Sequence, residues 1–62
     1  MNSQNIQHCI SYGLKISYHS DKQFPTPYAM AHQSHRMVAA VSQTDDEAVE
    51  KLVNRIREEE QL

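Results

Sequence analysis

Cysteine and glycine are almost absent from this sequence, and each scarcity removes a class of protein. The 62-residue chain has a single cysteine, Cys9, so an internal disulfide is excluded and nothing indicates an oxidising compartment. Its single glycine, Gly13, leaves no Gly-rich turn of the kind that builds an oxyanion hole at a helix start. We therefore do not expect Cys9 to act as a thiolate nucleophile with His8 or His19.

The sequence also lacks long hydrophobic runs and has no Lys or Arg near its N-terminus. The longest uninterrupted aliphatic run extends only from Met37 to Val41, and no Lys or Arg precedes Lys15. A membrane-spanning helix needs about 20 apolar residues, and a secretory signal begins with positive charge. The sequence therefore predicts a soluble cytoplasmic protein without a membrane partner.

Carboxylates are lacking in the segments that look like strands. Seven of the eight Asp and Glu residues lie from Asp45 onward, and the eighth, Asp21, falls in a predicted loop. Nucleases of the two-metal type hold divalent ions about 4 Å apart between carboxylates that project from strands. We therefore expect no metal-dependent hydrolysis, and more generally neither enzymatic activity nor a cofactor.

A structural zinc site remains an alternative because of the residue types present. The candidate zinc ligands would be Cys9, His19, His32 and His35. Their spacing is irregular, and His32 and His35 would point to opposite faces of a regular strand. The simpler interpretation is a set of polar histidines without a metal, and we expect no metal site.

The clearest pattern is a C-terminal helix over residues 44–60. Thr44 and Glu47 have the spacing of a capping box, and the acidic residues 45–47 suit the positive end of a helix dipole. The self-repelling acidic end, residues 58–62, is expected to fray. One apolar stripe with a 3.6-residue period runs along the helix, made of Ala48, Val49, Leu52, Val53 and Ile56.

Period-2 alternation predicts three strands before that helix, over residues 6–18, 28–33 and 37–42. Gly13 is interpreted as a bend in the first strand, and the Pro25–Thr26–Pro27 triplet marks a loop. Residues 1–5 lack a pattern and are expected to fray. The predicted fold is a single α+β domain, 1–62, in which one C-terminal amphipathic helix covers one face of a three-stranded antiparallel sheet (β-β-β-α).

The small size of the chain predicts self-association. A chain of about 60 residues buries only about 60% of its unfolded surface. The helix can cover only one sheet face, so an apolar face and a free edge remain. A second copy could cover that face, and we expect a homodimer.

Residues 28–56 resemble a HicB-type antitoxin domain, a β-β-β-α module described as a partial RNase H fold. The resemblance lies in Tyr28–Ala29–Met30–Ala31 as second strand, in residues 37–42 as third strand, and in Ser42–Gln43–Thr44–Asp45–Asp46–Glu47–Ala48 as the entry into the helix. It implies this fold and a protein-binding role. The family's Pro- and Gly-containing connection is replaced by Gln33–Ser34–His35–Arg36 here, and no operator binding is inferred.

These patterns predict a non-enzymatic regulator that occupies a protein partner, as an antitoxin or a small phage-type inhibitor does. The working parts would be the free sheet face, a free edge and the acidic helix. An alternative is a weak nucleic-acid-binding protein that uses Lys15, Lys22, Arg36 and the tyrosines on the sheet face. The predicted partner-binding residues are Tyr12, Lys15, Tyr18, Tyr28, His35, Arg36 and Glu50.

Overall fold

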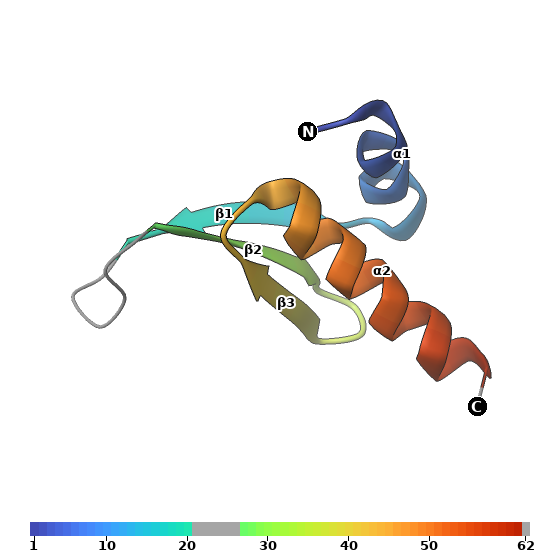
Figure 1. The fold of residues 1–62 in the computed structure, drawn as a ribbon. Helices are drawn as coiled ribbons and strands as arrows, with labels where there is room; N and C mark the ends of the chain where they lie inside the picture. Colours follow the sequence, from blue (N-terminus) through green and yellow to red (C-terminus); the bar gives the residue numbers. More distant parts are fainter. Residues whose placement is uncertain (21–26, 62) are drawn as a thin grey trace.

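The chain folds as an α+β structure in which a three-stranded antiparallel sheet is followed by a C-terminal helix, as predicted (Figure 1). The computed structural model describes residues 1–20 and 27–61. The interpretations of Asp21, Lys22 and Pro25 lie outside the described residues. The elements in chain order are α1 (Ser3–Tyr12), β1 (Lys15–His19), β2 (Tyr28–Gln33), β3 (Val38–Ser42) and α2 (Asp45–Gln61).

The first predicted strand is wrong over most of its length, because residues 3–12 form helix α1 and only Lys15–His19 is a strand. Residues 3–5, which were expected to fray, lie in the first turn of α1. Asn2 caps α1 by accepting a 2.8 Å hydrogen bond from the Asn5 backbone N–H. Gly13 ends the helix in the left-handed conformation at φ +65°, and its N–H bonds to the Cys9 carbonyl.

The alternation in residues 6–18 led to a wrong strand prediction because α1 buries an asparagine and exposes two isoleucines. Asn5 is only 1% exposed, whereas Ile6 and Ile10 are 47% and 69% exposed. Cys9 and Tyr12, which follow Asn5 at helical spacing, pack against the core. Ile6, Cys9 and Ile10 have helical spacing, but the two isoleucines are four residues apart and therefore fit the period-2 pattern of a strand equally well.

Replacement of Gly13 by alanine is expected to cost about 1–2 kcal/mol, because an L-residue in the left-handed region brings its Cβ close to the backbone. Beyond the adjacent residues, a Cβ at this position would meet no atom within 4 Å, so the loss would come from the local backbone conformation and not from a clash with another part of the fold. Gly13→Asn, which tolerates this region better, should lose less. Urea unfolding midpoints of the two variants test this expectation, and equal midpoints for Gly13→Ala and wild type would contradict it.

The strands pair in the order β1-β2-β3, each antiparallel to its neighbour. Ile16 lies opposite Ala31, which lies opposite Ala40, so these three share the face that packs against α2. A tight turn over residues 34–37 joins β2 to β3, with Met37 at φ +54°. The two predicted short strands are thus found, the second of them one residue shorter than expected.

Helix α2 covers one face of the sheet and supplies most of the core (Figure 1). Its predicted stripe, residues 48, 49, 52, 53 and 56, is entirely buried. Thr44 caps it as predicted, its hydroxyl accepting a 3.2 Å bond from the Glu47 N–H. The reciprocal half of the capping box is wrong, since the Glu47 carboxylate accepts from the Ser42 hydroxyl at 2.6 Å instead.

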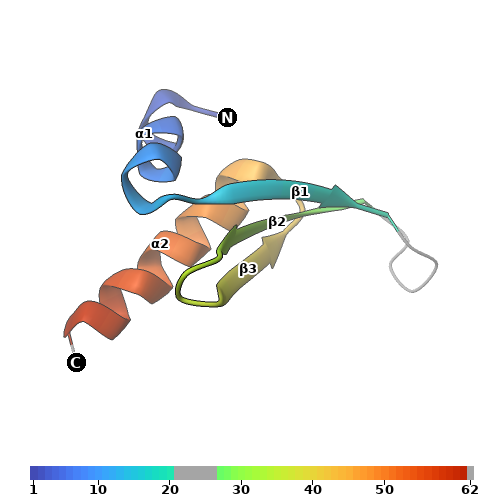
Figure 2. The same ribbon diagram turned by 180° about the vertical axis from the view of Figure 1, so that it is seen from behind.

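Helix α1 packs beside the first turns of α2, on the same side of the sheet (Figures 1 and 2). Seen from behind, the sheet lies in front and no described element covers it (Figure 2). Helix α2 continues to Gln61, so residues 58–61 are helical. Neither described helix has the length and apolarity needed to cross a membrane.

Candidate functional site

The uncovered side of the sheet, which we call the bare face, is defined by the strand register. Residues opposite one another on antiparallel strands share a face, and alternate residues share it along a strand. Ile16, Ala31 and Ala40 point to α2, so their immediate neighbours point away from it. The bare face therefore consists of Lys15, Ser17, His19, Tyr28, Met30, His32, Ala39 and Val41.

The bare face is apolar in the middle and aromatic or cationic at its ends. Met30 lies opposite Val41, which is 48% exposed. At one end the rings of His19 and Tyr28 stack, with centroids 5.3 Å apart and planes 20° apart. At the other end Lys15 lies opposite His32, next to the turn over residues 34–37. None of the described strand or turn residues is Asp or Glu, so this face carries no negative side chain.

The two outer edges of the sheet differ. Lys51 and Arg55 of α2 reach the β3 edge, where Lys51 Nζ donates to the Val41 carbonyl at 3.5 Å and Arg55 Nη1 donates to the Ala39 carbonyl. Those carbonyls therefore point away from β2. By the same alternation, the backbone groups of Ile16 and Tyr18 point outward from β1. They have no hydrogen-bond partner among the described residues, so the β1 edge is open.

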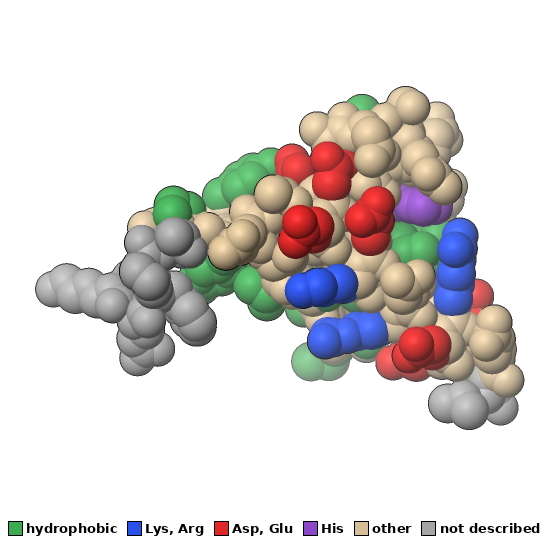
Figure 3. All heavy atoms as spheres, viewed as in Figure 1, with side chains coloured by type: hydrophobic (Ala, Val, Ile, Leu, Met, Phe, Trp, Pro, Cys, Tyr) green, Lys and Arg blue, Asp and Glu red, His purple; other side chains and the backbone are tan. Residues whose placement is uncertain are grey.

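The helix side of the molecule is acidic. Carboxylates gather over the first turns of α2, beside α1 (Figure 3). The Tyr18 hydroxyl donates a 2.9 Å bond to Asp45 Oδ2, and this bond raises the pKa of Tyr18. These carboxylates would repel phosphate groups, so the helix side disfavours nucleic acid.

Asp46 joins the two helices. Its Oδ1 accepts a 2.8 Å bond from Asn5 Nδ2 and a 3.0 Å bond from the Asn2 backbone N–H. Both bonds favour the ionised carboxylate, the Asn5 bond most strongly, and they hold the pKa of Asp46 below its ordinary value. The Asp46 carboxylate, in the first turn of α2, therefore holds α1 against α2 through hydrogen bonds.

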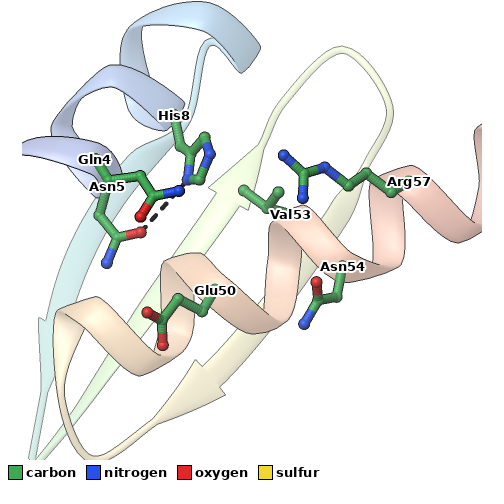
Figure 4. Close-up of a pocket in the computed structure, with 7 residues that line it drawn as sticks. All are labelled: Gln4, Asn5, His8, Glu50, Val53, Asn54 and Arg57. Atoms are coloured by element: carbon green, nitrogen blue, oxygen red, sulfur yellow. Dashed lines mark hydrogen bonds between the residues drawn. The ribbon is translucent and has the colours of Figure 1, made fainter.

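A polar cleft of about 260 Å³ lies between α1 and α2 (Figure 4). His8 and Arg57 face it from opposite helices, and the His8 Nδ1 contacts Asn5 Oδ1 at 3.4 Å. The cleft has no cysteine or hydroxyl side chain that could act as a nucleophile. Its lining residues are Gln4, Asn5, His8, Glu50, Val53, Asn54 and Arg57.

The predicted site residues divide between the two sides. Lys15 and Tyr28 lie on the bare face, and the turn that holds His35 and Arg36 borders it. Arg36 also makes an exposed 3.5 Å ion pair with Glu60, which is of little energetic weight. The remaining three, Tyr12, Tyr18 and Glu50, lie on the helix side.

Cys9 is separated from the histidines with which it was grouped. It lies half-buried in α1, and burial, followed by the charge of Asp45, raises the pKa of its thiol. The thiol is therefore protonated and poorly nucleophilic near neutral pH. His19 and His32 lie on the bare face, and no three His, Cys, Asp or Glu side chains in the described part of the chain are grouped to hold a metal ion.

The prediction omitted three central residues of the bare face, Met30, His32 and Val41. The alternation in residues 28–33 places Met30 and His32 with Tyr28, so the signal was present for β2. It was ambiguous for β3, where both faces are apolar. The face of β3 that α2 covers follows only from the pairing register of β3 with β2.

Comparisons with known proteins leave the family open. No protein-family model matches the chain, and no curated protein and no solved structure matches it either.

Proposed function

We propose that this chain is a non-enzymatic cytoplasmic regulator that acts by occupying a protein partner, which docks on the bare face. One observation carries the proposal: an uncovered sheet face has an apolar middle and no carboxylate among its described residues. The complementary partner offers an apolar surface bordered by Asp or Glu. Exposed apolar patches with polar rims are typical of protein-binding sites.

The residues of the bare face have the properties of a protein-binding surface. Met30 and Val41 supply apolar area at its centre, and methionine adapts its shape to a partner. Tyr28 supplies an aromatic ring held by its stack on His19. Lys15 and Arg36 at one end would steer an acidic partner toward the face.

The resemblance of residues 28–56 to HicB-type antitoxin domains leads to the same role. An antitoxin, like a small phage-type inhibitor, works by binding one protein and blocking it. We propose this mode of action, in which occupation of the partner is itself the effect and no reaction is catalysed.

Single-stranded nucleic acid is a second candidate, favoured by the His19–Tyr28 ring pair and by Lys15 on the same face. Bases stack on such rings, and cations track the phosphates. The bare face has one Lys, however, and the helix side is acidic. Tight phosphate binding uses several cations, so protein is the better match.

The test compares two variants that each add one carboxylate. Met30→Glu places it on the bare face, and Asn54→Glu places it on an exposed residue of α2 at the cleft between the helices, away from the bare face. A partner captured from cell extract is identified, purified and titrated against each variant. We expect a one-to-one complex whose Kd rises at least about tenfold for Met30→Glu, equivalent to about 1.4 kcal/mol, and is unchanged for Asn54→Glu.

Two results would contradict the proposal. One is equal affinity of wild type and Met30→Glu for the purified partner. The other is the absence of a stoichiometric protein together with binding to a single-stranded oligonucleotide that weakens steeply with salt. The second result would establish the nucleic-acid candidate in its place.

A further inference from the structure

We infer that the open edge of β1 pairs with β1 of a second copy, forming a two-fold symmetric dimer with one continuous six-stranded sheet. This interface differs from the bare face that the proposed function uses. It also differs from the face-to-face dimer expected from the sequence.

The first step is the difference between the edges. Natural proteins protect exposed edges, because unpaired N–H and C=O groups accept another strand. On β3, the outward carbonyls of Val41 and Ala39 accept hydrogen bonds from the side chains of Lys51 and Arg55. The outward backbone groups of Ile16 and Tyr18 on β1 have no such partner among the described residues.

The second step is that β1 complements itself. Antiparallel pairing centred on Ser17 sets Ile16 of one copy opposite Tyr18 of the other, and Lys15 opposite His19. An aromatic residue opposite a β-branched one is a favourable cross-strand pair. No two lysines meet, since the two-fold axis places Lys15 of each copy at opposite ends of the paired strands.

The third step is the apolar surface beside this edge. Tyr18 is 70% exposed on the helix side, and Ile6 and Ile10 are exposed on α1. Gln4 and His8 line the cleft, so the 100° helical step puts Ile6 and Ile10 on the other flank of α1. Helix α1 leads directly into β1 (Figure 2), so its exposed isoleucines add apolar surface to the segment that precedes the open strand.

The bare face suits a second copy less well. Two such faces stacked on each other would bring lysines and histidines together without a carboxylate among the described strand residues. At the β1 edge the two Lys15 residues lie at opposite ends of the paired strands, and each faces a single His19. A β1–β1 dimer also leaves both bare faces open, so dimerisation and partner binding can occur together.

A cysteine at the predicted two-fold axis tests the register. Ser17 would face its own copy in a non-hydrogen-bonded pair, with Cα atoms about 4.5 Å apart, which suits a disulfide. Two Lys15 residues would lie four steps apart, about 13 Å. In a Cys9→Ser background we expect oxidation to cross-link Ser17→Cys into a dimer and to leave Lys15→Cys monomeric. Equal cross-linking of both, or of neither, overturns the inference.

Proline substitutions test which edge is used. Tyr18→Pro removes an outward N–H from β1, and Val41→Pro removes the matching outward N–H from β3; each leaves the bonds to β2 in place. Sedimentation should give twice the 7.2 kDa chain mass for wild type and Val41→Pro, and the chain mass for Tyr18→Pro. A monomeric wild type at hundreds of micromolar, or a dimer lost only in Val41→Pro, overturns the inference.

Discussion

Replacement of Leu52 by alanine is expected to leave most of the chain unfolded at room temperature. Leu52 is 0% exposed, in the middle of the α2 stripe that packs on the sheet. Truncation of a buried leucine costs about 2–5 kcal/mol, because transfer energy is lost and a cavity remains. A core of this size supplies only about 3–5 kcal/mol in total, so one such substitution removes most of the stability.

Circular dichroism during urea titration measures this effect. Leu52→Met, which nearly conserves volume, should lose less than about 1.5 kcal/mol and keep a folded baseline. An unfolding midpoint for Leu52→Ala close to that of wild type would show that the α2 stripe does not hold the sheet.

Replacement of Asn5 by alanine is expected to release α1 while the sheet and α2 stay folded. The Asn5 amide is the side-chain link from α1 to Asp46, and Asn5 is 1% exposed. An isolated helix of ten residues is not stable in water, so α1 should unfold once released. The two helices contain 10 and 17 residues, so over a third of the helical signal should disappear. Gln4→Ala, at an exposed position of the same helix, is the matched control.

Acid should release α1 in the same way. The folded pKa of Asp46 is lowered, so the stabilisation is complete above the unfolded pKa and is lost as pH falls through the folded pKa. We therefore expect the helical signal to fall below about pH 4, the ordinary range for Asp. Asp46→Asn keeps an acceptor oxygen without the titrating charge, so its helical signal should change less with acid. Identical acid profiles for wild type and Asp46→Asn would contradict this role.

The parts of the fold that local patterns specify were predictable from the sequence. Helix α2 has a cap at Thr44 and a buried stripe, and both were found as predicted. Strand β2 alternates between small buried residues and larger half-buried ones, and its bounds match. In these segments the chemistry of single residues and their contacts in the fold favour the same structure.

Helix α1 could not be predicted from local sequence patterns, because its position depends on contacts with residues far away in the chain. Asn5 becomes an inward residue only when Asp46, 41 positions away, accepts its amide hydrogen bond. Gly13 ends a helix here, but the same residue also suits a bend in a strand. The candidate site has a similar limit: the alternation placed Tyr28 correctly opposite the small residues of β2, but Tyr12 and Tyr18 belong to the other side.

The cations that Lys51 and Arg55 place over β3 have a consequence for how far this protein can assemble. A sheet able to recruit strands on both sides could grow without limit into a fibril. One protected side makes association stop as soon as the other side is satisfied. In the proposed β1–β1 dimer, Lys51 and Arg55 would therefore limit assembly to two copies.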